Sequence, residues 1–558
     1  MDKRVLIGMA AIIIIGVGLY VFVFNQPPAS PNGNGGVPEK ATVRGVVTDA
    51  DGNPVQGATV KLGTQTTTSG ADGAYTFSVD AGSYTLTVTK QGFDQKTSAV
   101  TATAGQESVQ NLELTRTPTG AVDLKIITRH GSDILFKARD AFMQSDLAKQ
   151  YNIEKISFLS VSASLWADTI RRSGDIDIGW GGGPVVFDMV YNEGLLAPLT
   201  SDEVTVVMDQ FPDEISGSPT KRMSDGEVYW VGSAISSFGF TINTEFLSTE
   251  GLPEPKTWKD LTNETYAATL PSITSIGTAD ATLSTSNTRM FEIILQTYGW
   301  DEGWKLMTLM GANARIFDQS EGVRDAVIQG TIGAGTTIDF YGYTAQLENP
   351  EICKYVLPED GTAVNADPIA LVSTSKNPEA AQAFIAWVIS AEGQKVWLDP
   401  TINRMPINPA VFDTPEGQAR VDLLDSYEAT KNAIVIDFSD DLALSYETSM
   451  MFYYHDTLVV PQSDLIDVWL ELASAEKEGK ITHQQFLALA DDLGNPSEFT
   501  FKDPDSGETV AFTEEYAQSV NSRIGTDASF KDQLRSAWSA GAKARYDKVV
   551  ADLTALIG

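Results

Sequence analysis

Cysteine is almost absent from this chain of 558 residues, because Cys353 is the only one. A disulfide framework and metal sites built on cysteine, such as zinc or iron–sulfur sites, are therefore excluded. Basic residues are also scarce, since 39 Lys and Arg stand against 74 Asp and Glu, which gives a net charge of −35. Nucleic acid is excluded as a partner held by bulk electrostatics, because phosphate contacts need clustered Lys and Arg. The acidic surplus favours a solvated, soluble surface.

Catalytic signatures are missing too. The chain has no G-x-S-x-G, no H-E-x-x-H and no Walker loop, and two of its three histidines, His455 and His483, lie without the spacing of a metal pair. No pair of carboxylates stands out among the 74 acids. The sequence favours binding over catalysis and indicates no cofactor. An extracellular hydrolase that uses paired carboxylates stays open as an alternative.

One long apolar run exists, from Val5 to Phe24, directly after Lys3 and Arg4. Twenty residues at about 1.5 Å each span about 30 Å, the thickness of the hydrocarbon core of a bilayer. The run predicts a single-pass membrane anchor over residues 1–24, with the N-terminus in the cytoplasm and the bulk of the chain outside. A cleaved signal peptide is the alternative, although no A-x-A-like site follows.

Residues 25–40 are rich in Pro, Gly, Asn and Ser and predict a flexible linker. Residues 41–118 then show period-two alternation, with Tyr75, Phe77 and Val79 on one face of a strand, and Gly-containing turns between the strands. This pattern predicts a small β-sandwich. The run VRGVVTDADGNPVQGATV at 43–60 and the later TSGADGAY resemble the carboxypeptidase regulatory-like family over residues 42–115. The resemblance implies a fold and not an activity, so we expect a spacer or interaction domain.

From residue 121 to 410, predicted strands and helices alternate. Strands are expected over 122–128, 155–161 and 176–180, with helices over 133–150 and 164–172, which predicts an α/β fold with a parallel sheet. His130 and the run Gly181–Gly183 each follow a strand, where ligands of such sheets bind. Residues 411–558 are predicted to be a mainly helical extension packed on a lobe.

Seven segments of this region carry a family resemblance: IITRHG at 126–131, DIDIGWGGGP at 175–184, TWKDL at 257–261, NTRMFEII at 287–294, GVRDAVIQG at 322–330, VLPEDGT at 356–362 and NPEAAQAFI at 377–385. In this order they resemble the type II periplasmic solute-binding proteins of ABC importers, in the branch that handles ferric ion, thiamine, phosphonates and sugar phosphates. The resemblance implies two α/β lobes joined by a hinge that close on a ligand. It also implies an ABC permease and an ATPase as partners.

Two ligand chemistries follow. In ferric-binding relatives, a histidine after the first strand and two adjacent tyrosines hold iron; here His130 and Tyr341 match, but Phe340 stands at the second tyrosine position. An oxyanion would instead use converging backbone N–H groups of the glycine run and a hydroxyl-rich helix start. The phenylalanine favours a small phosphate-, phosphonate- or carboxylate-bearing solute over ferric ion. The expected ligand-binding residues are His130, Gly131, Trp180, Gly181, Gly182, Gly183, Ser284, Ser286, Thr288, Asp339 and Tyr341, with His130 and Tyr341 as metal ligands only for ferric ion.

The sequence therefore predicts a membrane-anchored, extracytoplasmic solute-binding component of an ABC importer, with a β-sandwich between the anchor and the binding domain. The main rival is a surface sensor or adhesin that binds without transport.

Overall fold

The computed structural model describes residues 39–50, 52–90, 92–115 and 120–558, and these fall into two units, 1–117 and 118–558. The predicted anchor lies outside the described residues, as does most of the predicted linker. Among the described residues, no helix has the length and apolar character needed to cross a membrane.

The first unit consists of two small β-sheets. One contains β1 (Ala41–Asp49), β4 (Ala74–Val79), β7 (Glu107–Val109) and β8 (Leu112–Leu114), and the other contains β2 (Thr59–Leu62), β3 (Gln65–Thr68), β5 (Gly82–Thr89) and β6 (Lys96–Ala102). Alternate residues of β4, namely Tyr75, Phe77 and Val79, are buried, as the period-two pattern predicts. The sandwich-like architecture expected for this segment is thereby confirmed.

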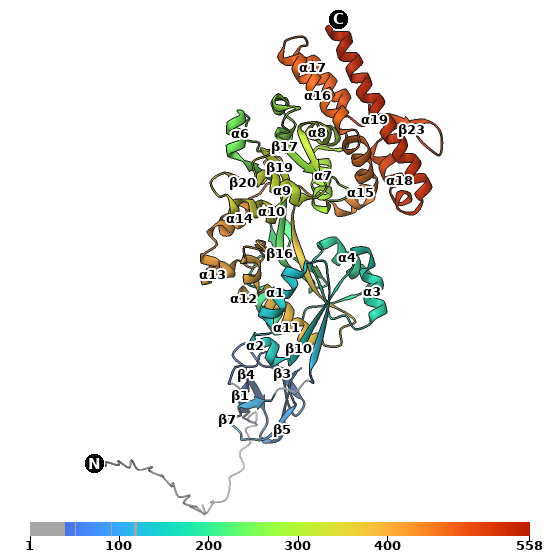
Figure 1. The fold of residues 1–558 in the computed structure, drawn as a ribbon. Helices are drawn as coiled ribbons and strands as arrows, with labels where there is room; N and C mark the ends of the chain where they lie inside the picture. The colour runs from blue at the N-terminus through green and yellow to red at the C-terminus, as the bar shows by residue number, and fades with distance from the viewer. Residues whose placement is uncertain (1–38, 51, 91, 116–119) are drawn as a thin grey trace, which may run out of the picture. The chain divides into compact units, whose positions relative to one another are not determined.

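The second unit has two α/β lobes that share one sheet (Figure 1). In lobe 1, β9 (Val122–Thr128) pairs in parallel with β10 (Ile153–Ser160) and β11 (Ile178–Trp180). In lobe 2, β17 (Ile276–Ala279) pairs in parallel with β18 (Ala314–Phe317) and β19 (Ala334–Ile338). The main path through this 12-stranded sheet is β10-β9-β11-β21-β16-β19-β17-β18, where β21 is Val364–Val372 and β16 is Glu227–Asn243, and the other four strands pair with β16 or β21. The two-lobed architecture implied by the family resemblance is confirmed.

One long strand runs through both lobes. β16 (Glu227–Asn243) pairs with β21 (Val364–Val372) through residues 231–237 and with β19 through residues 238–242. Its small residues permit close approach, since a Cβ at Gly239 would lie 2.2 Å from the carbonyl oxygen of Val356. β16 is therefore the element that holds the two lobes in register.

Helices cover both lobes. In lobe 1 they are α1 (Ser132–Phe142), α2 (Asp146–Gln150), α3 (Trp166–Ser173), α4 (Pro184–Asn192), α5 (Asp202–Met208), α11 (Pro378–Ile389) and α12 (Ala391–Leu398). In lobe 2 they are α6 (Thr244–Glu250), α7 (Thr285–Tyr298), α8 (Trp300–Asn313), α9 (Ser320–Ile328) and α10 (Asp339–Glu348). The helix expected over 133–150 is two helices, because Ser145 caps the second one by accepting from the backbone N–H of Ala148.

After residue 410 the chain first completes lobe 1 and then builds on lobe 2. α13 (Pro415–Gln418) and α14 (Val421–Lys431) belong to lobe 1, whose core includes Leu423 and Tyr427, so this core reaches past the predicted boundary at residue 410. The remaining elements share the core of lobe 2: α15 (Asp440–Tyr454), a π-helical turn (His455–Val459), α16 (Gln462–Lys477), α17 (His483–Gly494), the hairpin β23 (Thr500–Lys502) and β24 (Thr509–Ala511), α18 (Glu514–Thr526) and α19 (Ala528–Ile557). The indole of buried Trp469, for example, donates to Asn313 Oδ1 at 2.7 Å.

Candidate functional site

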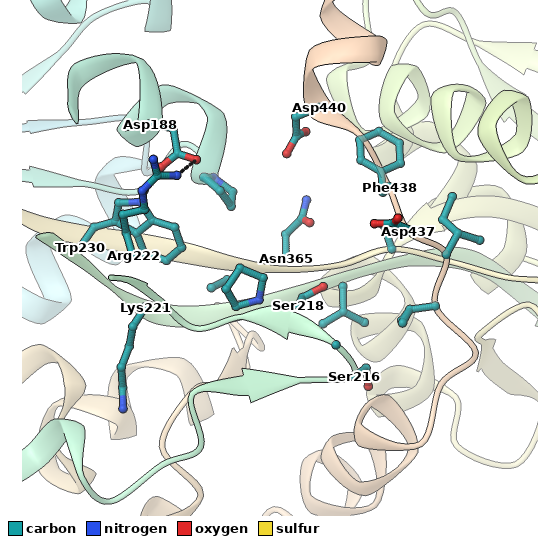
Figure 2. A pocket seen from close by; sticks show the side chains of 18 of the residues that line it. Asp188, Ser216, Ser218, Lys221, Arg222, Trp230, Asn365, Asp437, Phe438 and Asp440 are labelled. Carbon is teal, nitrogen blue, oxygen red and sulfur yellow. Dashed lines mark hydrogen bonds and ion pairs between the residues drawn. The ribbon is translucent and has the colours of Figure 1, made fainter. Parts of the chain in front are cut away.

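A cavity of about 680 Å³ lies within the second unit. Its walls come from the first turns of α4, from the strand segment around Arg222 and Trp230, from residues 363–366 at the start of β21, and from the segment 435–440 (Figure 2). This last segment connects α14 of lobe 1 with α15 on lobe 2, and its residues Ile436 and Phe438 pack against the core of lobe 2. Both lobes therefore contribute to the cavity.

The lobe 1 wall carries an ion pair between Arg222 and Asp188. Arg222 Nη1 lies 3.2 Å from Asp188 Oδ2, and the indole of Trp230 donates to Asp188 Oδ1 at 2.9 Å. Lys221 points away from the cavity, because its ammonium donates to the carbonyl of Met208 (Figure 2). Arg222 is thus the cation that this wall offers to a ligand.

The opposite wall is acidic. Asp440 Oδ1 lies 2.8 Å from Arg289 Nη1, and burial together with the charges of Asp188 and Asp441 raises the pKa of Asp440 despite this ion pair. Among the described residues, the side chain of Asp437 makes no hydrogen bond or ion pair, and neither does that of Asn365 on the cavity floor. These two side chains are free to meet a ligand.

None of the residues expected from the sequence in lobe 1 lines this cavity; His130 and the glycine run lie around a buried carboxylate, whose chain neighbour Ala366 does line it. Asp367, on β21, sits 3.0 Å from Arg404 Nη1 and 3.9 Å from His130 Nε2. Burial lowers the pKa of His130 from its ordinary 6.5 to about 4, although Asp367 opposes the shift. His130 is therefore a neutral imidazole at neutral pH.

The glycine run is also directed at Asp367. Gly181, Gly182 and Gly183 have φ values of +75°, +120° and +80°, which L side chains rarely adopt. The N–H groups of Gly182 and Gly183 donate to Asp367 Oδ1 at 2.9 and 3.3 Å, and that of Gly181 donates to the carbonyl of Pro368 at 2.8 Å. Two of the three amides thus converge on an oxyanion, but this oxyanion is a side chain of the protein, and binding of a solute by the glycine run stays a prediction.

The two remaining predicted residues of lobe 1 have structural contacts. Trp180 is buried, packs edge-on against His130 with ring centroids 4.8 Å apart, and donates to Ser233 Oγ at 3.0 Å. Gly131 is the N-cap residue of α1.

In lobe 2, the predicted hydroxyl groups of Ser284, Ser286 and Thr288 form hydrogen bonds with other groups of the protein. Ser284 caps α7, and both Ser284 and Ser286 contact Ser320 Oγ, at 2.8 and 2.6 Å. The hydroxyl of Thr288 donates to the carbonyl of Ala281 at 2.8 Å. These groups order the helix start and line a different part of the lobe from the 680 Å³ cavity.

Asp339 and Tyr341 lie at the start of α10. The buried Asp339 accepts from the backbone N–H of Ser237 at 3.0 Å, and burial raises its pKa to about 7 against the attraction of Arg404. The hydroxyl of Tyr341 donates a hydrogen bond to Glu321 at 2.9 Å. Burial and this hydrogen bond raise the pKa of Tyr341 above its ordinary value, which disfavours the phenolate that iron needs. No cluster of three or more His, Cys, Asp or Glu side chains suited to a metal ion occurs in the described part of the chain.

Sequence reasoning missed Asp188, Arg222, Asn365, Asp367, Arg404 and Asp437. Asp367 carried a signal, because an acid followed by proline interrupts an otherwise apolar strand, VNADPIALV. The others stand in segments with no distinguishing pattern.

Residues 151–425 match the family described as bacterial extracellular solute-binding protein, and residues 42–115 match the carboxypeptidase regulatory-like domain. The phosphoglycerate transport regulatory protein PgtC of Salmonella typhimurium is 28% identical over 260 residues, which are 46% of this chain. The match spans 61% of the length of that relative. An uncharacterized protein of Haemophilus influenzae is 25% identical over 260 residues, covering 44% of this chain and 68% of the relative.

Among solved structures, the periplasmic binding protein AfuA from Actinobacillus pleuropneumoniae is 17% identical, with a TM-score of 0.43, and the match covers 62% of this chain and 98% of that one. An ABC transporter structure from Clostridium perfringens is 21% identical, with a TM-score of 0.44 and coverage of 59% and 97%.

Proposed function

We propose that this chain, whose residues 151–425 belong to the family of bacterial extracellular solute-binding proteins, is the extracytoplasmic solute-binding component of an ABC importer. In this proposal residues 5–24 anchor it to the membrane and a permease and an ATPase are its partners. The observation that carries the proposal is the 680 Å³ cavity to which both lobes contribute. Its volume is in the range of small-molecule sites, about 300–1,000 Å³.

The polar groups of the cavity support a small solute that carries an anionic group and hydroxyl groups. Arg222 and the free amide of Asn365 can donate to a phosphate, phosphonate or carboxylate. On the opposite wall, the carboxylates of Asp437 and Asp440 can accept hydrogen bonds from hydroxyl groups of the solute. A relative named for phosphoglycerate, which carries a phosphate, a carboxylate and a hydroxyl, supports the same class of solute. Ferric ion has less support, because the described residues contain no metal-ligand cluster.

The binding proposal is tested by measuring the melting temperature with 3-phosphoglycerate, inorganic phosphate, a phosphonate and ferric citrate. A solute at about 100 times its Kd stabilises the folded state by about 2.7 kcal/mol. Replacing Arg222 with Met is expected to weaken binding of the anionic solute by about 1.5–3 kcal/mol, the value of a hydrogen bond to a charged group. Lys221→Met is the matched control, because its ammonium faces away from the cavity. Equal effects of the two substitutions would contradict the placement of the solute.

A sensing role is the second candidate, since the relative PgtC is named a transport regulatory protein. Uptake of the radiolabelled solute by cells that lack and then regain this chain separates the two. Uptake that does not depend on the chain, combined with intact solute binding, would favour the sensor.

A further inference from the structure

Asp367 stands among donors of the kind that proteins use to hold anions. Its carboxylate accepts hydrogen bonds from the backbone N–H groups of Gly182 and Gly183. It also faces the guanidinium of Arg404 and the imidazole of His130. A guanidinium and convergent backbone amides are the usual donor set of a phosphate or carboxylate site. The side chain is 11% exposed, so the site is shielded from most of the bulk solvent but can be reached from it.

The donors exceed what one carboxylate takes up. His130 Nε2 and Arg404 Nε are buried and have no hydrogen-bond partner among the described residues. Arg404 also donates to Ser236 at 2.9 Å and stacks over the rings of Phe340 and Trp397, which fixes its guanidinium in place. The positive charge and the spare N–H groups are thus held rigidly around the position that Asp367 fills.

A second buried carboxylate of lobe 1 provides the contrast. Asp177 accepts from the backbone N–H groups of Lys125 and Lys376 and from the hydroxyl of Ser375, at 2.9, 3.3 and 2.6 Å. It makes no ion pair with a guanidinium or imidazole in the described part of the chain. Asp177 ties loops together, whereas Asp367 lies in a charged site.

We propose that Asp367 is a built-in ligand that fills the anion site formed at the strand ends by Gly182, Gly183, Arg404 and His130, and so sets the specificity of the solute cavity beside it. The inference rests on the proposed function, because it concerns where an anionic solute can bind. With the strand-end site occupied by the protein's own carboxylate, the anionic group of a solute is directed to Arg222 in the cavity. The site itself is latent, and removal of Asp367 opens it to a small anion.

The test is chemical rescue of Asp367→Ala with formate, which replaces the atoms that the substitution removes. Melting of the full chain is followed by tryptophan fluorescence in sodium formate and in sodium chloride of equal ionic strength. The variant is expected to melt below the wild type in chloride and to gain about 2–4 °C in saturating formate. The wild type and Asp177→Ala are expected to gain less than about 1 °C. Adding Arg404→Met to the alanine variant is expected to abolish the gain.

A formate response of Asp367→Ala no larger than that of Asp177→Ala would overturn the proposal. If the alanine variant does not fold, Asp367→Ser replaces it, because this shorter side chain leaves room for formate beside the N–H groups of Gly182 and Gly183. Formate is then expected to raise its melting temperature by at least about 2 °C more than that of the wild type, and an equal response would overturn the proposal. Neither measurement contains the transported solute, so the result is independent of whether the cavity binds the proposed solute class.

Discussion

The buried His130 makes the stability of the second unit depend on pH in a way that can be calculated. Its pKa is about 4 in the folded protein and its ordinary value is 6.5. Between these values the unfolded chain binds a proton that the folded chain does not, so the free energy of unfolding falls as pH decreases from 6.5 to 4. The difference between these two pKa values corresponds to about 3 kcal/mol of unfolding free energy. Above pH 6.5 the imidazole is neutral in both states and contributes no dependence.

The perturbation is His130→Gln, which removes the titrating group. The assay is urea unfolding of both proteins at pH 4.5 and pH 7. All ten tryptophans lie between residues 166 and 538, so their fluorescence reports on the second unit alone. From pH 7 to pH 4.5 the wild type is expected to lose about 2–3 kcal/mol more than the variant. Buried acids such as Asp339 are present in both proteins and cancel in this difference.

A constant offset between the two proteins across this pH range would refute the argument. A smaller loss in the wild type would also refute it, because it would mean that His130 is protonated in the folded protein and paired with Asp367.

Three further predictions concern other parts of the structure. The buried Glu292 has a pKa raised to about 8 by burial against the attraction of Arg289. The free energy of unfolding of Glu292→Gln is therefore expected to rise by about 3.5 kcal/mol relative to that of the wild type from pH 5 to pH 8, measured by urea unfolding, and a pH-independent difference would contradict this. Gly181→Ala is expected to cost about 2–3 kcal/mol of stability, because the residue has a φ of +75° and the new Cβ would lie 2.5 Å from His130 Nε2. Gly183→Ala, at a φ of +80° with nothing within 4 Å of the new Cβ, is its control and is expected to cost about 1 kcal/mol, so equal losses would exclude the clash. Removal of residues 1–117, which form a unit with its own core, is expected to leave solute affinity within about 0.5 kcal/mol by calorimetry, and a larger loss would mean that this unit contributes to binding.

The features that sequence predicted best depend on short-range periodicity. Tyr75, Phe77 and Val79 are two residues apart, and this spacing alone places them on one face of a strand. The alternation of strands and helices after residue 120 predicted the α/β lobes for the same reason. Patterns of this kind are complete within a few residues, so no knowledge of the rest of the chain is needed.

The candidate site was less predictable because its contacts join distant parts of the chain. The glycine run indicates convergent amides, but their acceptor, Asp367, comes 185 residues after Gly182. Arg404, which completes the charged site, is 274 residues from His130. The cavity wall at Asp437 lies in a connection between helices that has no pattern of its own. The pairing of β21 with β11 and β16 brings Asp367 to the glycine run, and the pairing of β16 with the strand Met405–Pro406 brings Arg404 to the same place.

The segment 435–440 couples the cavity to the C-terminal helices, because it forms a wall of the cavity and also leads into α15 and the helices that follow. A change in the position of this segment alters the shape of the cavity and the start of α15 together. Binding free energies at two sites that share such an element are coupled reciprocally. A partner that bound α15–α19 in only one position of the segment would therefore change the affinity for the solute by some factor, and the solute would change the affinity for that partner by the same factor.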